Sequence, residues 1–101
     1  MTNILILVGT LWITGCTDTG DLTKSETDPR VGITCAAPPW IPFGTHLIID
    51  GVPGEWVVED WTAKRFRHNT VDLYMKDRKT AIKWGRKPRK VWIKKMITIS
   101  K

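Results

Sequence analysis

Asp60 and Asp72 are the two residues of this sequence best suited to acid–base chemistry. Asp72 lies in the alternating segment 70–75, on the face opposite the apolar side chains, and Tyr74 shares its face. Asp60 ends a second extended segment, 55–60. A partly buried carboxyl group beside another carboxylate keeps its proton to higher pH and can act as a general acid. The alternative is that one or both aspartates cap turns by accepting backbone N–H bonds.

The sequence offers no metal or cofactor site. His46 and His68 are far apart, and neither lies near a cluster of cysteines or carboxylates. Cys16 and Cys35 are the two cysteines, and they also lack metal-ligand spacing. If Cys16 stays unmodified in an oxidising compartment, a bridge to Cys35 is an open alternative. We therefore expect no metal and no cofactor.

The elements that must position the aspartates are short strands with tight turns. β-branched content and alternation predict strands at 31–35, 45–49, 55–60, 70–75 and 91–99. Asp77 is expected to cap a short helix that ends at Gly85, followed by a basic turn over 86–90. This pattern favours a small, mainly β domain over residues 31–101, built as a barrel with one short helix.

The N-terminal segment predicts export. Residues 1–15 carry no charged side chain, and their apolar run is too short to span a bilayer. They fit a signal peptide. The residues Ile13-Thr14-Gly15-Cys16 resemble the lipobox of bacterial lipoproteins, which implies lipidation of Cys16. The alternative is a buried first strand that ends in an ordinary cysteine.

The residues that follow, 16–30, are polar and acidic, and they predict a flexible tether between membrane and domain. The expected location is the cell envelope, with the lipid holding the chain to a membrane. In a Gram-negative cell this would be the periplasmic face of the outer membrane.

Charge and tryptophan content indicate the partners. From Lys64 onward the chain is strongly basic, and before Lys64 it is acidic. A basic half favours an anionic partner, but no nucleic-acid recognition motif is present, so nucleic acid is not expected. The chain has 6 Trp. Trp40 and Trp61 fall in predicted loops near the aspartates, where a flat ring could stack on a sugar face.

Five motifs, in order, resemble the three-aspartate (3D) domain found in the membrane-bound lytic transglycosylase A family and in small exported cell-wall proteins. They are Ile41-Pro42-Phe43-Gly44-Thr45, Val57-Val58-Glu59-Asp60, Val71-Asp72-Leu73-Tyr74, Ala81 to Gly85, and Val91-Trp92-Ile93. The resemblance spans residues 32–94. It implies a six-stranded double-psi β-barrel. The segment before residue 31 is short for a first strand, so a truncated barrel is an open alternative.

The same resemblance implies the activity. Asp72 matches the catalytic acid/base, and Asp60 matches the aspartate beside it. Ala37 stands where the family has its first aspartate, and residues 61–64 replace a Gly-Gly pair. The implied reaction cleaves the β-1,4 bond between N-acetylmuramic acid and N-acetylglucosamine in peptidoglycan. From their positions near the aspartates, Trp61, Tyr74 and Trp40 are the expected substrate-binding residues.

A second function remains open because of these departures. The chain could be a non-catalytic cell-wall-binding or lysis-accessory lipoprotein that keeps the barrel without turnover. In both cases the expected partners are peptidoglycan glycan strands and a membrane reached through the lipid on Cys16.

Overall fold

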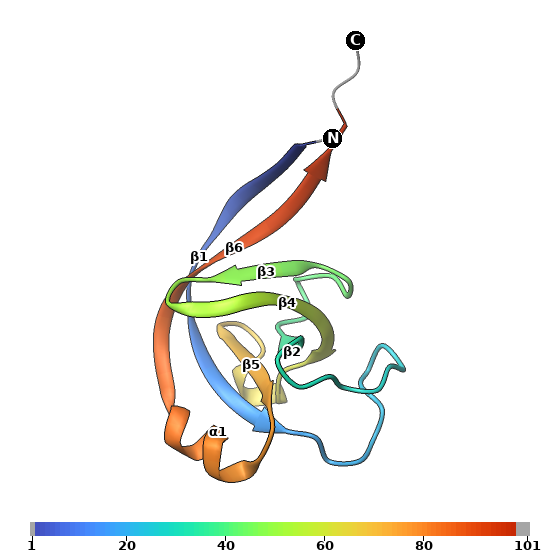
Figure 1. Ribbon diagram of the computed structural model, residues 1–101, viewed down its shortest axis with the longest axis vertical. Coiled ribbons are helices and arrows are strands. Elements are labelled where there is room, and N and C mark those ends of the chain that lie inside the picture. The colour runs from blue at the N-terminus through green and yellow to red at the C-terminus, as the bar shows by residue number, and fades with distance from the viewer. Residues whose placement is uncertain (1, 99–101) are drawn as a thin grey trace.

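The computed structural model describes residues 2–98, which form a closed six-stranded barrel with one α-helix (Figure 1). The strands are β1 (Thr2–Thr17), β2 (Thr34–Ala37), β3 (His46–Ile49), β4 (Val52–Trp61), β5 (Thr70–Met75) and β6 (Arg86–Ile97). The helices are α1 (Arg78–Trp84) and the short 3-10 helix η1 (Lys64–Phe66). A small, mainly β barrel with one short α-helix is thus confirmed.

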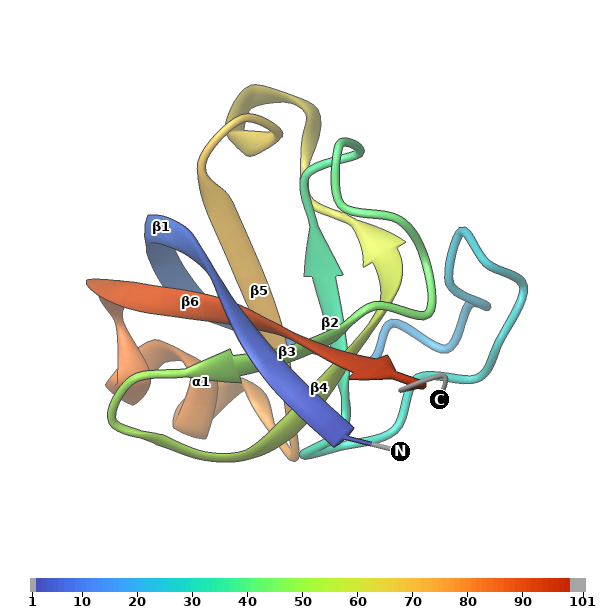
Figure 2. The ribbon, with the colours of Figure 1, turned by 90° about the horizontal axis from the view of Figure 1, so that it is seen from above.

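The strand pairing has a two-fold pattern. Around the barrel the order is β1-β5-β2-β4-β3-β6, with β6 closing on β1 (Figure 2). The pairs β1–β5 and β2–β4 are parallel, and the other four are antiparallel. Exchanging β1 with β4, β2 with β5 and β3 with β6 reproduces every pair. The barrel is therefore two equivalent three-stranded halves, as a double-psi barrel requires.

β1 is formed by the residues for which the sequence predicts a signal peptide. It pairs with β5 through residues 12–17 and with β6 through residues 2–14. Leu11 and Ile13 point into the core, where Ile13 is fully buried. The alternative of a buried first strand is the one the structure shows, and the first strand is not truncated. Cleavage after Gly15 would leave the barrel open between β5 and β6.

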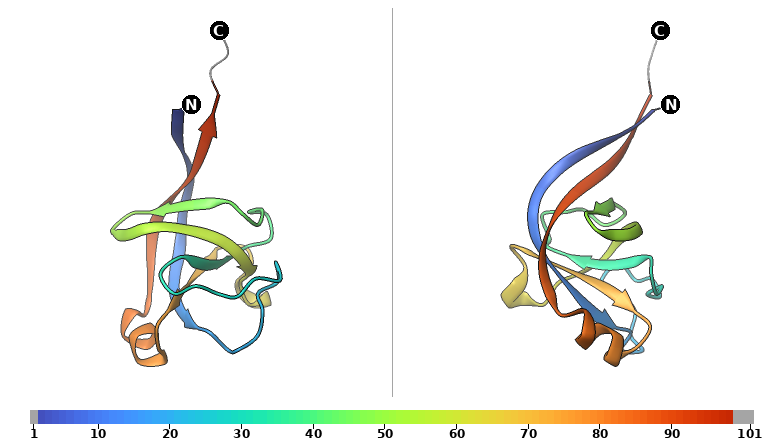
Figure 3. Two further views of the ribbon diagram at one scale, coloured as in Figure 1. Left: turned by 45° about the vertical axis from the view of Figure 1, so that its right-hand side comes forward. Right: turned by 60° about the vertical axis from the view of Figure 1, so that its left-hand side comes forward.

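The outer ends of β1 and β6 extend beyond the barrel as a two-stranded ribbon (Figure 3). A bulge between Leu7 and Gly9 marks where the ribbon leaves the wall, and Gly9 has a φ of 138° that favours glycine. Leu5 and Leu7 on the ribbon are each 55% exposed. The apolar N-terminal run is therefore divided between the core and a projecting arm.

The core fills the barrel interior with inward side chains from every strand. Its buried members are Leu11, Ile13, Cys35, Ala37, Ile41, Leu47, Ile49, Val52, Trp56, Val58, Val71, Leu73 and Val91. The one cysteine among them, Cys35, is fully buried as a free thiol. The alternation along β5 therefore leaves Asp72 and Tyr74 on the outer face of the wall.

The helix was predicted correctly, but the basic turn over 86–90 was not. Asp77 caps α1 by accepting a hydrogen bond from the backbone N–H of Thr80 at 2.7 Å, and Gly85 ends the helix with a φ of 75°. Residues 86–90 instead begin β6 and pair with β1. Pro88 is tolerated there because β3 pairs only with residues 91–94 of β6, so the Pro88 nitrogen needs no partner.

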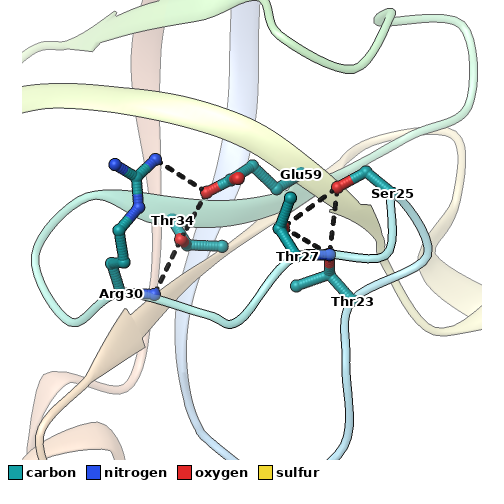
Figure 4. Close-up of polar contacts among 6 residues, drawn as sticks. All are labelled: Thr23, Ser25, Thr27, Arg30, Thr34 and Glu59. Carbon is teal, nitrogen blue, oxygen red and sulfur yellow. Dashed lines mark hydrogen bonds and ion pairs between the residues drawn. The ribbon is translucent and has the colours of Figure 1, made fainter.

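The predicted tether is, in the structure, a loop held against the barrel (Figure 4). In the first part of this loop, the hydroxyl groups of Thr23, Ser25 and Thr27 form hydrogen bonds with one another. The backbone N–H of Ser25 donates to the carbonyl of Glu59 at 3.1 Å. Polar composition predicted a solvated chain, but β4 supplies partners that only the folded barrel brings close.

Glu59 fixes the second part of this loop. Its Oε1 accepts from the Arg30 guanidinium at 3.0 Å and from the Thr34 hydroxyl at 2.6 Å. Burial raises the pKa of Glu59, but hydrogen bonds from Thr34, Arg30 and Thr27 outweigh it and leave the pKa below its ordinary value. The ionised carboxylate is therefore the form that holds the loop.

Glu59→Gln should lower the free energy of unfolding by about 1–3 kcal/mol at pH 7, because a neutral amide accepts the same bonds more weakly and has no ion pair with Arg30. The contribution of Glu59 is present above its unfolded pKa of 4.5 and is lost as pH falls through the lower folded value. Urea denaturation at pH 7 and pH 3 measures both effects. Asp28→Asn, an exposed position in the same loop, is the control and should change little. Equal losses for both variants would contradict this role.

Candidate functional site

The two candidate aspartates lie in one row on the outer face of the barrel. Ala36 on β2 is paired with Asp60 on β4 and with Asp72 on β5. Thr14 on β1 is paired with Asp72 from the other side. Paired residues on adjacent strands share a face. The row Thr14–Asp72–Ala36–Asp60 therefore crosses four strands, with the small Ala36 between the two carboxyl groups.

Asp72 is a partly buried carboxyl group that makes no hydrogen bond within residues 2–98. Burial raises the pKa of Asp72 to about 6, the Arg86 charge lowers it, and the Asp60 charge raises it. Desolvation thus dominates, and the like charge of Asp60 adds to it. A carboxyl group that holds a proton close to neutral pH, with free lone pairs, can donate that proton to a ligand.

Asp60 is anchored on both oxygens. Oδ1 accepts the backbone N–H groups of Lys24 at 3.1 Å and Trp61 at 2.9 Å. Oδ2 accepts the Tyr74 hydroxyl at 3.0 Å. Three donors fix the orientation of this carboxylate, and its charge raises the pKa of Asp72. Asp60 thus makes the backbone bonds of a structural aspartate and also lies in the row of the site.

A second row, formed by Tyr74 and Cys16, lies directly beside the first. Cys16 on β1 is paired with Tyr74 on β5. Burial, Asp72 and Asp60 raise the pKa of the Cys16 thiol to about 12, and burial with the bond to Asp60 raises the pKa of Tyr74. Both groups are therefore neutral at pH 7. Cys16 and Cys35 are both free, and they lie on opposite faces of the wall, so no bridge joins them.

Trp61 and Trp40, the two tryptophans predicted to stack on sugars, make different contacts. Trp61 directly follows Asp60, is 39% exposed, and stacks on Phe43 with ring centroids 5.6 Å apart. Trp40 is 54% exposed in the turn after β2. Within residues 2–98 no hydrogen bond or ring contact joins Trp40 to the aspartates. Tyr74 and Trp61 thus contact Asp60 directly, through the Tyr74 hydroxyl and the Trp61 backbone N–H.

Sequence reasoning missed Thr14 and Arg86, and it did not place Cys16 beside the aspartates. The Arg86 guanidinium lies over the Trp12 and Phe66 rings, 4.7 and 5.0 Å from their centroids. Arg86 supplies the positive charge that lowers the pKa of Asp72, although the basic residues at 64–67 are nearer to Asp72 in the sequence. The inward alternation of Leu11 and Ile13 was the available signal, because it predicts a strand with Thr14 facing outward.

Asp72→Asn should stabilise the fold at pH 7.5 while it removes the acid. The raised folded pKa means that the Asp72 contribution is fully present below its unfolded pKa of 3.8 and is lost as pH rises through about 6. An amide avoids this loss, so the variant should gain about 1–3 kcal/mol at pH 7.5. At pH 3.5 the gain should vanish. Thermal unfolding at both pH values measures this, and a gain independent of pH would contradict it.

Comparison with known proteins gives no relative from which the site can be assigned. Neither family models, curated proteins nor solved structures give a match to this chain. Among residues 2–98, no group of three potential metal ligands comes together. No helix in the same range has the length and apolar character needed to cross a bilayer. The site is therefore defined by the aspartate row, Tyr74 and Cys16.

Proposed function

We propose that this chain is a peptidoglycan-cleaving enzyme of the lytic transglycosylase type, with Asp72 as its acid and base. The observation that carries the proposal is the unpartnered Asp72 carboxyl, whose pKa is raised to about 6, held beside the anchored Asp60 carboxylate. The motif order from Ile41 to Ile93 supports the same substrate by its resemblance to the three-aspartate domain.

The reaction needs one acid that becomes a base. Asp72 donates its proton to the glycosidic oxygen between the muramyl C1 and the next sugar, and that bond breaks. The Asp72 carboxylate then takes the proton of the muramyl C6 hydroxyl, whose oxygen bonds to C1 and closes a 1,6-anhydro ring. No water is consumed, and Asp72 ends protonated. Ordinary glycosidases differ because they need two carboxyl groups at a set separation.

Asp60, held by Tyr74, stabilises the positive charge that develops at C1 during this reaction. C1 becomes positive as the bond breaks, and a fixed carboxylate near it lowers the energy of that state. Tyr74 keeps Asp60 in place through its 3.0 Å hydrogen bond and remains neutral. Trp61 and Trp40 offer exposed rings on which sugar units can stack.

The substrate implies action at the cell envelope, and we propose that the acting form retains β1. Lipidation of Cys16 requires cleavage before it, which would remove the strand that pairs with β5 and β6. The intact mass of the chain recovered from bacterial envelopes decides between the two forms. A mass that includes residues 1–15 is expected. A lipid-bearing chain that begins at Cys16 would restore the lipoprotein alternative.

A non-catalytic wall-binding protein is the second candidate function. Two alanines favour it, since Ala36 separates the aspartates and the buried Ala37 stands where the family has a third carboxylate. Such a protein would bind glycan strands with the same exposed rings and leave them intact.

Purified sacculi separate the two functions. The full chain is incubated with them, and soluble products are analysed by mass spectrometry. Anhydromuropeptides, lighter by one water than hydrolysis products, are expected. Co-sedimentation without any released product would support the binding protein, and products with ordinary reducing ends would replace the proposed reaction with hydrolysis.

A further inference from the structure

A cavity of about 400 Å³ adjoins the candidate site at the end of β1. It is lined by residues 15–17, by Thr19, and by Arg78, Ala81 and Ile82 of α1. Cys16 belongs to both the cavity and the site, because it is paired with Tyr74. The cavity therefore adjoins the second row of the site, which lies beside the aspartate row.

The α1 side of the cavity is positively charged. Within residues 78–84 the helix carries Arg78, Lys79 and Lys83 and no acidic residue, and the Asp77 carboxylate just before it is bonded to the backbone N–H of Thr80. Arg78 is exposed and makes no ion pair with any residue in the range 2–98. Asp18, between two lining residues, accepts the backbone N–H of Gly20 at 2.8 Å and so is directed to its own turn. Charge complementarity thus favours an anionic group at Arg78.

The floor of the cavity is small and partly apolar. Ile82 is 67% exposed, and Ala81 beside it is half-buried. An ideal Cβ at Gly15 would lie only 3.1 Å from the Ala81 Cα, so strand and helix approach closely there. A ligand that fits must combine aliphatic surface with negative charge, because simple phosphate would leave Ile82 uncovered.

We propose that this cavity binds the carboxylate-bearing peptide substituent of the muramyl residue, with Arg78 pairing to a carboxylate. The peptide is attached to the same sugar whose C1 reacts at Asp72, so a cavity adjoining the site is where it must go. This assignment of the ligand rests on the proposed function. Arg78 is a specificity residue and Asp72 remains the acid.

A binding measurement tests the cavity without turnover. Calorimetric titration compares a muramyl peptide with free carboxylates against the same peptide with its carboxylates amidated. The wild type should bind the carboxylate form about twofold to fivefold more tightly, as expected for an exposed ion pair. Arg78→Gln should abolish this preference, and Lys79→Gln, on the same helix but outside the cavity lining, should keep it. Equal preference in all three proteins would overturn the proposal.

A cleavage measurement separates this proposal from the proposed function. Glycan strands with peptides and strands stripped of peptides are given to the wild type and to Arg78→Gln. Loss of rate confined to peptide-bearing strands is expected, and equal loss on both would overturn the role of Arg78. If the wild type cleaves neither but binds the carboxylate peptide through Arg78, the cavity assignment stands and the enzyme proposal fails.

Discussion

A chain that lacks residues 1–15 is expected to be unfolded at 25 °C. The deletion removes most of β1, and with it the pairing to β6 through residues 2–14 and much of the pairing to β5. It also removes the buried side chains of Leu11 and Ile13. A domain of this size has only about 5–15 kcal/mol of stability, so losing a whole barrel strand exceeds the margin. Circular dichroism and amide exchange of the purified variant measure the outcome.

A matched pair of point variants localises the effect within β1. Ile13→Ala, at a fully buried position, should cost about 2–5 kcal/mol through lost transfer energy and the cavity left behind. Ile6→Ala, in the projecting ribbon where the side chain is 43% exposed, should cost less than about 1 kcal/mol. The free energy of unfolding in urea gives both values.

Two results together would contradict the role of β1 in closing the barrel. If the chain without residues 1–15 folds with the same cooperativity as the full chain, and Ile13→Ala costs no more than Ile6→Ala, β1 is dispensable. The signal peptide predicted from the apolar run would then be the better interpretation of these residues.

Asp72→Asn should reduce anhydromuropeptide release by about 10²–10⁴-fold, the usual contribution of a general acid. Asparagine keeps the size of the side chain but has no proton to give at the glycosidic oxygen. Rates on purified sacculi, measured under substrate excess, provide the test. Asp50→Asn, an exposed aspartate in the turn between β3 and β4, is the matched control and should keep full activity.

The pH dependence distinguishes an acid from a structural group. Only protonated Asp72 can start the reaction, and burial raises its pKa to about 6. The wild-type rate should therefore fall about tenfold for each pH unit above this value. Asp60→Asn removes a like charge that raises the Asp72 pKa, so the fall should begin at lower pH. A wild-type rate unchanged between pH 6 and pH 8, or full activity in Asp72→Asn, would rule out Asp72 as the acid.

Local signals predicted most elements of the second half of the chain. β5 was predicted with its observed bounds because alternation over 70–75 is strict. The helix was predicted because Asp77 and Gly85 have the chemistry of its two ends. These signals depend on neighbouring residues alone. The prediction of a basic turn at 86–90 was wrong. Charge and Pro88 indicate a loop locally, whereas pairing with β1 makes the segment a strand.

The strand formed by residues 2–17 and the ordered loop after it were not predicted, for a related reason. An uncharged apolar run can enter a membrane or the wall of a barrel, and its composition is the same in both settings. The choice depends on whether β5 and β6 offer unpaired edges, and their residues that pair with β1 are 58 or more positions away in the sequence. The loop after β1 likewise owes its order to Glu59, a residue of β4.

The sequence by itself determined that Asp60, Asp72 and Tyr74 share a β-rich domain and that Asp72 faces away from the apolar side of its strand. Only the tertiary structure decided that Ala36 sets the two carboxyl groups in one row and that Cys16, paired with Tyr74, lies beside that row. It also decided that Arg86 is the cation acting on Asp72. The reason is physical, because the pKa of a carboxyl group depends on burial and on charges that arrive from distant strands.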